Sequence, residues 1–211
     1  MFPSEKKFYK LTLQQRRRRM KIRGSIGLLV GIVIAGLLCF GDRMGIFGSG
    51  AGENDLKQYH NKTFLVVKTV DGDTIDIDVP DHKKRSAHTR IRLWGIDTPE
   101  TVKPNHPVEH FGPEASRFTK TKALHQWVRI ELLPHRTRDK YDRLLAYVYL
   151  PDGQMLNREL IALGLGYAYP YSDHPYDTEF EKLQRQARKN KVGLWKNIKY
   201  EELPWYMKKL R

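Results

Sequence analysis

The feature that most limits the fold of this chain is a series of short segments that are rich in β-branched residues and separated by turn signals. Five segments have this character, at residues 63–70, 74–79, 90–96, 127–133 and 144–150. The dipeptide Asp71-Gly72, which is typical of tight hairpin turns, separates the first two. We therefore predict five short β-strands, of which the first two form a hairpin.

Three further segments predict helices, at residues 112–126, 156–164 and 178–191. The first opens with Gly112-Pro113-Glu114, where proline loses no hydrogen bond and the acid complements the positive end of the helix dipole. The order of elements, βββαββαα, suits an α+β fold, namely a five-stranded OB-fold Greek-key β-barrel of antiparallel strands with three helices. Periodicity alone also allows a plain α+β sandwich.

The N-terminal part of the chain differs from the rest in charge. Residues 24–41 contain no charged residue, whereas residues 1–23 contain nine basic residues and one acid. As a helix, the uncharged run would be about 27 Å long, close to the hydrocarbon thickness of a bilayer. We expect a single-pass transmembrane helix at 24–41, with 1–23 in the cytoplasm and the following domain on the extracytoplasmic side. A cleaved signal segment followed by secretion is one alternative, and a buried core helix is another.

Composition divides the rest of the chain into three parts. Residues 42–60 predict a linker, residues 61–198 hold every predicted strand and helix of one domain, and residues 199–211 predict a basic tail. The formal net charge is +14, of which residues 54–211 carry +7, so charge favours nucleic acid, anionic lipid or an acidic protein as a partner. The single cysteine, Cys39, excludes an intrachain disulfide and a cysteine zinc cluster.

Acidic residues gather where the predicted strands end. Asp71 and Asp73 lie at the first hairpin, and Asp97 and Glu100 follow the third strand. If the first three strands form a meander, these two turns meet, and their carboxylates repel each other unless a cation joins them. Their hard oxygen atoms suit calcium or magnesium. The alternative is that both motifs are ordinary turns without a ligand.

Two arginines lie near these turns in the sequence. Arg92 is on the third strand, five residues before Asp97, and Arg143 begins the fifth strand. Arg92 and Asp97 would face the same site only if the strand is irregular between them, and Gly95 permits such an irregularity. Two guanidinium groups beside a carboxylate-held cation would grip a phosphate in bidentate geometry. The alternative for each is a solvated or salt-bridged surface arginine.

These motifs occur together and in order. They are Asp71-Gly72-Asp73-Thr74, Arg92, Asp97-Thr98-Pro99-Glu100, Gly112-Pro113-Glu114-Ala115 and Asp139-Lys140-Tyr141-Asp142-Arg143. In this combination the chain resembles the staphylococcal nuclease family, over about residues 63–195. The resemblance implies an OB-type barrel and calcium-dependent cleavage of phosphodiester bonds in DNA and RNA with little sequence preference.

The resemblance also implies a role for individual residues at one site. The implied set is Asp73, Asp97 and the backbone carbonyl of Thr98 as calcium ligands, Arg92 and Arg143 as phosphate-binding catalytic arginines, Glu100 as the residue that positions the attacking water, and Lys140 and Tyr141 as substrate contacts. Glu100 would orient the water first and accept its proton second.

Two features depart from the family pattern. Asp142 stands where the best-known member has glycine, and the loop at residues 80–88 is longer and more basic. An Asp142 that paired with Arg143 would weaken the hold of that arginine on phosphate. Pro170 disturbs the match nearby, so none of the adjacent tyrosines is assigned to base stacking.

Single-stranded or unpaired DNA and RNA are thus the expected substrates, and the N-terminal helix is the expected contact with a membrane. Nothing in the sequence indicates an obligate protein partner. Two other classes of protein stay open. One is a catalytically inactive OB-fold module that binds nucleic acid at a membrane. The other is an interaction module whose basic N-terminus binds lipid.

Overall fold

The structure of the protein is a computed structural model that describes residues 50–171 and 173–209. The predicted cytoplasmic segment 1–23, the predicted transmembrane helix 24–41 and the start of the predicted linker lie outside the described residues. Among the residues that are described, no helix has both the length and the apolar character needed to cross a membrane.

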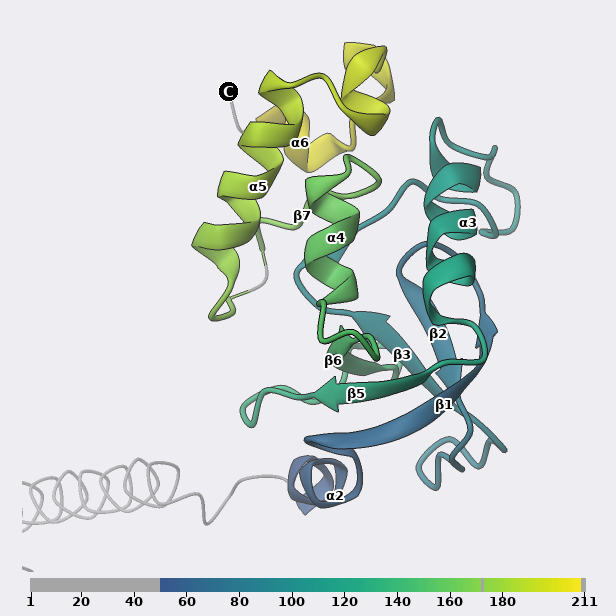
Figure 1. Cartoon of the computed structure of the whole chain (residues 1–211). Helices are drawn as coiled ribbons and strands as arrows, with labels where there is room; N and C mark the ends of the chain where they lie inside the picture. The colour runs from purple at the N-terminus through teal and green to yellow at the C-terminus, as the bar shows by residue number, and fades with distance from the viewer. Residues whose placement is uncertain (1–49, 172, 210–211) are drawn as a thin grey trace, which may run out of the picture. The chain divides into compact units, whose positions relative to one another are not determined.

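Strands and helices alternate along the described chain in an order close to the predicted one (Figure 1). The elements are α2 (Gly50–Tyr59), β1 (Lys62–Thr69), β2 (Thr74–Ile77), β3 (Thr89–Leu93), β4 (Ile96–Asp97), α3 (Gly112–Ala123), β5 (Trp127–Glu131), β6 (Leu144–Tyr149), α4 (Leu156–Ala162), β7 (Tyr167–Ala168), α5 (Asp177–Lys189), the 3₁₀ helices η1 (Gly193–Lys196) and η2 (Tyr200–Glu202), and α6 (Trp205–Lys209).

Five strands close into a barrel in the order β1-β2-β3-β6-β5, so the predicted five-stranded barrel is confirmed. The prediction that all neighbouring strands are antiparallel is wrong for one pair, because β3 and β6 are parallel. The reason is geometric: strand directions can alternate all the way round a closed ring only when the number of strands is even. A closed barrel of five strands therefore needs one parallel pair.

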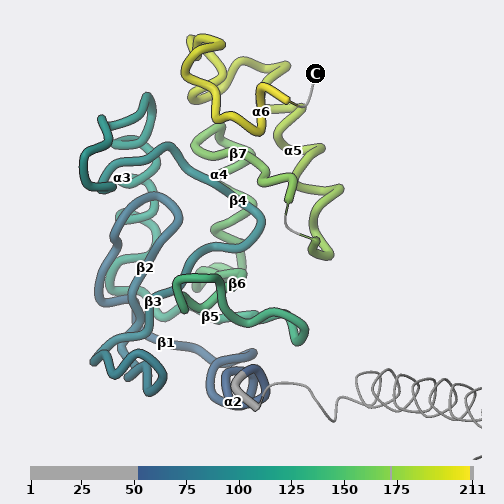
Figure 2. Tube along the Cα trace, turned by 180° about the vertical axis from the view of Figure 1, so that it is seen from behind, coloured from purple at the N-terminus to yellow at the C-terminus, as the bar shows by residue number. Residues whose placement is uncertain are grey.

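The barrel interior forms the main core of the described chain. Along β3 the side chains alternate, so that Ile91 and Leu93 are fully buried while Arg90 and Arg92 on the other face are partly exposed. Helix α2 lies on one side of the barrel, and α3, α4 and α5 lie on the opposite side (Figures 1 and 2). The alternation places Arg92 outside the core while the pairing of β3 with β2 and β6 fixes its backbone.

The second half of the predicted linker is not a linker. Residues 50–59 form helix α2, which packs against the barrel through Tyr59, a fully buried residue whose hydroxyl is 3.0 Å from the Thr89 hydroxyl. The segment has few apolar residues, so its burial could not be predicted from hydropathy. Leu56 also packs against the barrel core, and Asp55 is buried on the same helix.

The predicted basic tail is folded as well. Residues 200–209 form η2 and α6, and Tyr206 and Met207 are buried in a second, smaller core beside α5, η1 and β7. The Gln184 side chain links this core together, because its amide nitrogen contacts the Met207 sulfur and its oxygen accepts a hydrogen bond from the Ala168 N–H. The domain thus extends beyond residue 198 at its C-terminal end.

A buried ion-pair network connects α2 to the segment before β6. The Arg138 guanidinium, with a side chain only 7% exposed, donates to both carboxylate oxygens of Asp55 at 2.8 Å and to Asp81 at 2.7 Å. Burial alone would lower the pKa of Arg138, but these hydrogen bonds raise it above its ordinary value. Arg138 therefore stays charged, and both carboxylates compensate its buried charge.

We expect Asp55→Ala to lower the free energy of unfolding by about 3 kcal/mol, because it leaves two buried N–H donors of Arg138 and the Thr137 hydroxyl without their hydrogen-bond acceptor. Urea denaturation followed by circular dichroism would measure the change. Glu53→Ala on the same helix is the matched control, because Glu53 is exposed and pairs only with exposed Lys57. Equal stabilities of the two variants would contradict a stabilising role for the network.

Candidate active site

The hairpin between β1 and β2 brings Asp73 to the end of the barrel. Gly72 sits so close to the chain after β4 that a Cβ at this position would lie 2.7 Å from the Thr98 hydroxyl. The Asp73 carboxylate accepts hydrogen bonds from the Thr98 N–H at 2.8 Å and from the Thr98 hydroxyl at 3.1 Å. The two predicted acidic turns therefore meet, and glycine is required where they touch.

A sharp turn after β3 brings Asp97 to the same place. The predicted third strand ends at Leu93, and Gly95 adopts a φ of 76°, a left-handed conformation that favours glycine. The chain then resumes as β4, which pairs with β7. A Cβ on Gly95 would also lie 2.5 Å from the His174 ring. The bend predicted at Gly95 is thus present, and it turns Asp97 toward Arg92.

The Arg92 guanidinium lies between the two carboxylates. One of its amino nitrogens contacts Asp73, and the other donates to the Asp97 carboxylate at 2.7 Å. All three side chains are at least partly buried. Two carboxylates therefore face one cationic group, which offsets part of the repulsion between them.

Burial and the charges around this cluster shift the pKa of Asp71. Burial raises its pKa, the nearby guanidinium groups of Arg92 and Arg143 lower it, and the Glu100 carboxylate raises it further. The net result is a pKa above the ordinary value. These influences show that Arg92, Arg143 and Glu100 all lie within electrostatic range of the first hairpin.

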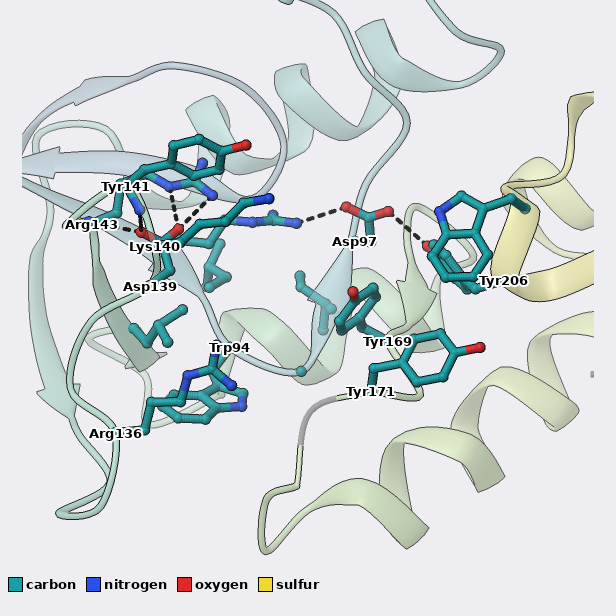
Figure 3. A pocket seen from close by; sticks show the side chains of 16 residues that line it. Trp94, Asp97, Arg136, Asp139, Lys140, Tyr141, Arg143, Tyr169, Tyr171 and Tyr206 are labelled. Carbon is teal, nitrogen blue, oxygen red and sulfur yellow. Dashed lines mark hydrogen bonds and ion pairs between the residues drawn. The ribbon is translucent and has the colours of Figure 1, made fainter. Parts of the chain in front are cut away.

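A pocket of about 480 Å³ lies beside this cluster, and Figure 3 shows the side chains that line it. Tyr141, Arg143 and Lys140 lie on one side of it, and Asp97, Tyr169, Tyr171 and Tyr206 lie on the other. The pocket is lined by Arg92, Leu93, Trp94, Gly95, Ile96, Asp97, Arg136, Asp139, Lys140, Tyr141, Arg143, Leu145, Tyr169, Tyr171, Trp205 and Tyr206. Cations and aromatic rings therefore surround an opening whose inner edge carries a carboxylate.

Five of the eight predicted site residues line this pocket, and two lie next to it. The five are Arg92, Asp97, Lys140, Tyr141 and Arg143. Asp73 and Thr98 are the two: Asp73 contacts Arg92, and Thr98 donates hydrogen bonds to Asp73.

Glu100 neither lines the pocket nor contacts Asp73, Arg92 or Asp97 through any of its hydrogen bonds. Its carboxylate oxygen Oε1 accepts three backbone hydrogen bonds, from the N–H groups of residues 101, 102 and 103, at 2.9 to 3.1 Å. Its own N–H donates to the Glu109 carboxylate at 2.9 Å. The Glu100 side chain is therefore held in one orientation by its own loop.

The loop from Asp139 to Arg143 fixes the second arginine. The Asp139 carboxylate accepts from the Arg143 Nε and from its backbone N–H, at 2.7 and 3.0 Å. The guanidinium also lies 5.4 Å from the centre of the exposed Tyr141 ring. Arg143 is thus oriented from one edge by a carboxylate, and it keeps a face toward the pocket.

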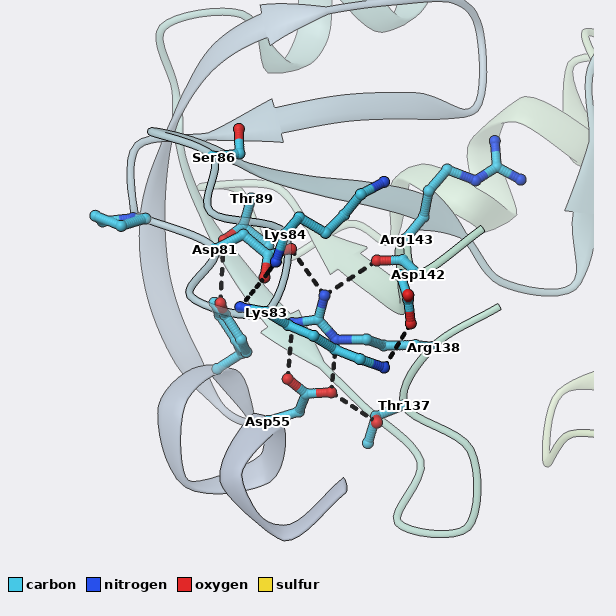
Figure 4. A network of polar contacts seen from close by, with 12 residues as sticks. Asp55, Asp81, Lys83, Lys84, Ser86, Thr89, Thr137, Arg138, Asp142 and Arg143 are labelled. Atoms are coloured by element: carbon cyan, nitrogen blue, oxygen red, sulfur yellow. Dashed lines mark hydrogen bonds and ion pairs between the residues drawn. The ribbon is translucent and has the colours of Figure 1, made fainter. Parts of the chain in front are cut away.

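The two departures from the family pattern contact each other (Figure 4). Asp142 has a φ of 59°, where glycine is the usual residue, and its carboxylate pairs with Lys83 at 2.5 Å rather than with Arg143. Hydrogen bonding to Lys83 lowers the pKa of Asp142. The Lys84 ammonium donates to the Tyr141 carbonyl at 3.0 Å. The longer basic loop therefore holds the extra carboxylate away from the arginine.

Sequence reasoning missed the contribution of the C-terminal segment to this site. The Tyr206 hydroxyl donates a hydrogen bond to Asp97 at 2.7 Å, and Trp205 lines the pocket. Burial and the adjacent Asp97 carboxylate raise the pKa of Tyr206, which keeps the hydroxyl protonated as a donor. The only signal in the sequence is the apolar Trp205-Tyr206-Met207 triplet inside a basic tail.

The donor set fits a hard divalent cation. Across residues 50–171 and 173–209 there is no group of three or more His, Cys, Asp or Glu side chains placed to hold a metal ion. The predicted ligands are the carboxylates of Asp73 and Asp97 and the backbone carbonyl of Thr98. Both carboxylates contact the Arg92 guanidinium. Calcium takes about six to eight oxygen ligands, more than two carboxylates and one carbonyl supply, so such a site would retain bound water.

Comparison with known proteins agrees with the geometry. The family described as "Staphylococcal nuclease homologue" matches residues 90–197. The chain is 37% identical over 178 residues to the thermonuclease of Staphylococcus hyicus, covering 84% of this chain and 99% of the relative. It is 41% identical over 152 residues to the thermonuclease of Staphylococcus intermedius, covering 71% of this chain and 86% of the relative.

Another relative is described as an endonuclease. Over 135 residues the chain is 35% identical to the endonuclease YncB of Bacillus subtilis, covering 63% of this chain and 61% of the relative. The family match begins at residue 90 and contains Arg92, Asp97 and Arg143, and the longer match to the Staphylococcus hyicus enzyme also spans the whole barrel and both acidic turns. This chain therefore belongs to the staphylococcal nuclease family and is a nuclease hydrolase.

Proposed function

We propose that this nuclease depends on calcium and cleaves phosphodiester bonds of both DNA and RNA with little sequence preference. The observation that carries the proposal is the meeting of Asp73, Asp97 and Arg92 at the inner edge of a pocket lined by cations and aromatic rings. A phosphodiester is an anion, so its hydrolysis requires charge neutralisation and accurate positioning above all.

Asp73, Asp97 and the Thr98 carbonyl would hold the calcium ion. When bound, calcium supplies positive charge to the phosphate and lowers the pKa of a coordinated water. The hydrogen bonds from Thr98 to Asp73 keep that carboxylate in place, and Arg92 keeps Asp97 in place. Carboxylates held in this way need little reorganisation when a cation binds.

The two arginines would bind the scissile phosphate. Arg92 and Arg143 both line the pocket; Arg92 is held by two carboxylates, one at each amino nitrogen, and Arg143 is held by the Asp139 carboxylate along one edge of its guanidinium. Their remaining N–H groups would donate to the phosphate oxygens, whose negative charge grows during the reaction. Lys140 and Tyr141 lie beside Arg143 at the pocket surface and would contact neighbouring phosphates.

Glu100 would orient the attacking water. Its Oε1 is held by three backbone N–H groups, so its Oε2 has a defined direction from which to accept a proton from water. The carboxylate lies within electrostatic range of Asp71, at the first hairpin. Rigid support from its own loop is consistent with a positioning role.

The substrates we propose are single-stranded or unpaired nucleic acids. The pocket offers cations for phosphates and aromatic faces for bases, and such surfaces bind single strands without reading their sequence. Direct sequence readout in a duplex would instead require an element that enters a groove.

We also propose that residues 24–41 anchor the nuclease in a membrane, with the catalytic domain outside the cytoplasm. The proposal rests on the uncharged run and the basic flank before it. On this proposal, the full-length protein sediments with membranes, and protease added to intact spheroplasts digests the domain. Recovery of the domain as a shorter soluble product would instead support cleavage and secretion.

We expect calcium to restore and a chelator to abolish cleavage of both single-stranded DNA and RNA. Asp73→Asn should weaken calcium binding by roughly tenfold or more, because one of two carboxylate ligands loses its charge. Calorimetric calcium titration beside gel-based cleavage assays measures both effects. Asp152→Asn, in an exposed turn, is the matched control. Cleavage that persists in chelator would contradict calcium dependence, and calcium-dependent binding without cleavage would indicate an inactive module.

Arg143→Ala should lower kcat by roughly 10²- to 10³-fold, the usual loss when one transition-state donor is removed. Arg143→Lys should recover little of the lost kcat, because lysine retains the charge but lacks the planar bidentate geometry. Steady-state kinetics on a single-stranded oligonucleotide tests both variants. Arg185→Ala removes an exposed arginine of α5 that pairs with Glu181 and serves as the control. A kcat near that of the control would refute the role.

A further inference from the structure

Two adjacent residues of helix α6 differ in how far their side chains are exposed. Tyr206 is buried in the second core, whereas its neighbour Trp205 is 57% exposed. Both nevertheless line the pocket that contains Arg92 and Arg143. The helix therefore forms part of the wall of the active site.

Tyr206 contacts the carboxylate that we assign to calcium. Its hydroxyl donates to Asp97 Oδ2, while Arg92 donates to Asp97 Oδ1, both at 2.7 Å. Figure 3 shows the Asp97 carboxylate with one donor on each side. Two donors on opposite oxygens fix the plane of the carboxylate, as partners of ligand groups commonly do in metal sites.

Trp205 forms an aromatic surface together with Tyr171. The two rings are nearly parallel, with an interplanar angle of 14° and centroids 5.6 Å apart. Tyr171 is 53% exposed, so both rings are accessible at the pocket rim. The Lys209 ammonium lies 4.8 Å from the centre of the Trp205 ring and adds positive charge. Large exposed aromatic rings beside cations form the kind of surface on which unpaired bases stack.

We propose that α6 is a working part of the nuclease site, in which Trp205 stacks on an unpaired base of the substrate and Tyr206 positions Asp97. The proposal rests on the nuclease function proposed above and deepens it by naming a base-binding subsite on the C-terminal segment. Trp205 is a substrate-binding residue and Tyr206 is a positioning residue. The occupant is a nucleobase, because the phosphate-binding cations of the pocket, Arg92 and Arg143, would hold the backbone to which that base is attached.

The first test separates stacking from catalysis. Fluorescence anisotropy without divalent ions measures binding of a labelled single-stranded DNA oligonucleotide and of an abasic oligonucleotide of the same length. Trp205→Ala should weaken binding of the base-containing strand by roughly tenfold, the value of one stacked base, and leave abasic binding unchanged. Trp205→Phe should restore most of the loss. Trp127→Ala is the matched control, because Trp127 is 62% exposed and lies outside the pocket.

The second test addresses Tyr206. Tyr206→Phe removes only the hydroxyl and should weaken calcium binding by roughly 10- to 100-fold in a calorimetric titration of the free protein, with kcat lowered at limiting calcium and recovered at saturation.

Each test has an outcome that would overturn its part of the proposal. If Trp205→Ala weakens binding of the base-containing and the abasic strand equally, Trp205 does not stack on a base. Calcium affinity of Tyr206→Phe equal to that of the unmodified protein would overturn the positioning role.

The measurements distinguish failure of this proposal from failure of the proposed nuclease function. If the unmodified protein does not cleave nucleic acid with calcium, the proposed function fails whatever the variants do. The binding comparison does not require cleavage, so it decides the role of Trp205 in either case. Thermal denaturation of each variant shows whether the fold is retained, and Trp205→Ala should retain it because the side chain is largely exposed.

Discussion

The ion pairs of Arg92 with Asp73 and Asp97 are the contacts on which the rest of the site depends. Two carboxylates placed side by side in partly buried positions would repel each other and separate the turns that carry them. Arg92 lies near the end of β3, where its backbone is paired with Thr74 of β2 on one side and Leu145 of β6 on the other. The barrel therefore sets the position of the guanidinium, and the guanidinium sets the distance between the acidic turns.

The barrel could be predicted from the sequence because its signals are local. Alternation at Ile91 and Leu93 and the Asp71-Gly72 turn each involve residues within a few positions of one another. The same holds for the site residues that the acidic turns carry, since strand order alone brings hairpin ends together. The parallel pairing of β3 with β6 is not local, but the closure of five strands into a ring requires it.

Helix α2 and helix α6 could not be predicted because their stability comes from distant partners. Asp55 is buried by pairing with Arg138, 83 residues away, and Tyr206 is held by Asp97, 109 residues away. Neither segment has the apolar periodicity that marks a helix packed on a core. Polar residues that become buried through one specific partner leave no pattern in the local sequence.

The two ends of the described chain support opposite sides of the pocket. Helix α2 binds Arg138, which directly precedes the loop from Asp139 to Arg143, and Lys83 and Lys84 hold Asp142 and Tyr141 of that loop. Helix α6 supports the other side through Asp97. A barrel limited to residues 61–198 would contain every family motif and still lack both supports. Accurate placement of the reacting groups therefore depends on residues outside the part of the chain that the motifs define.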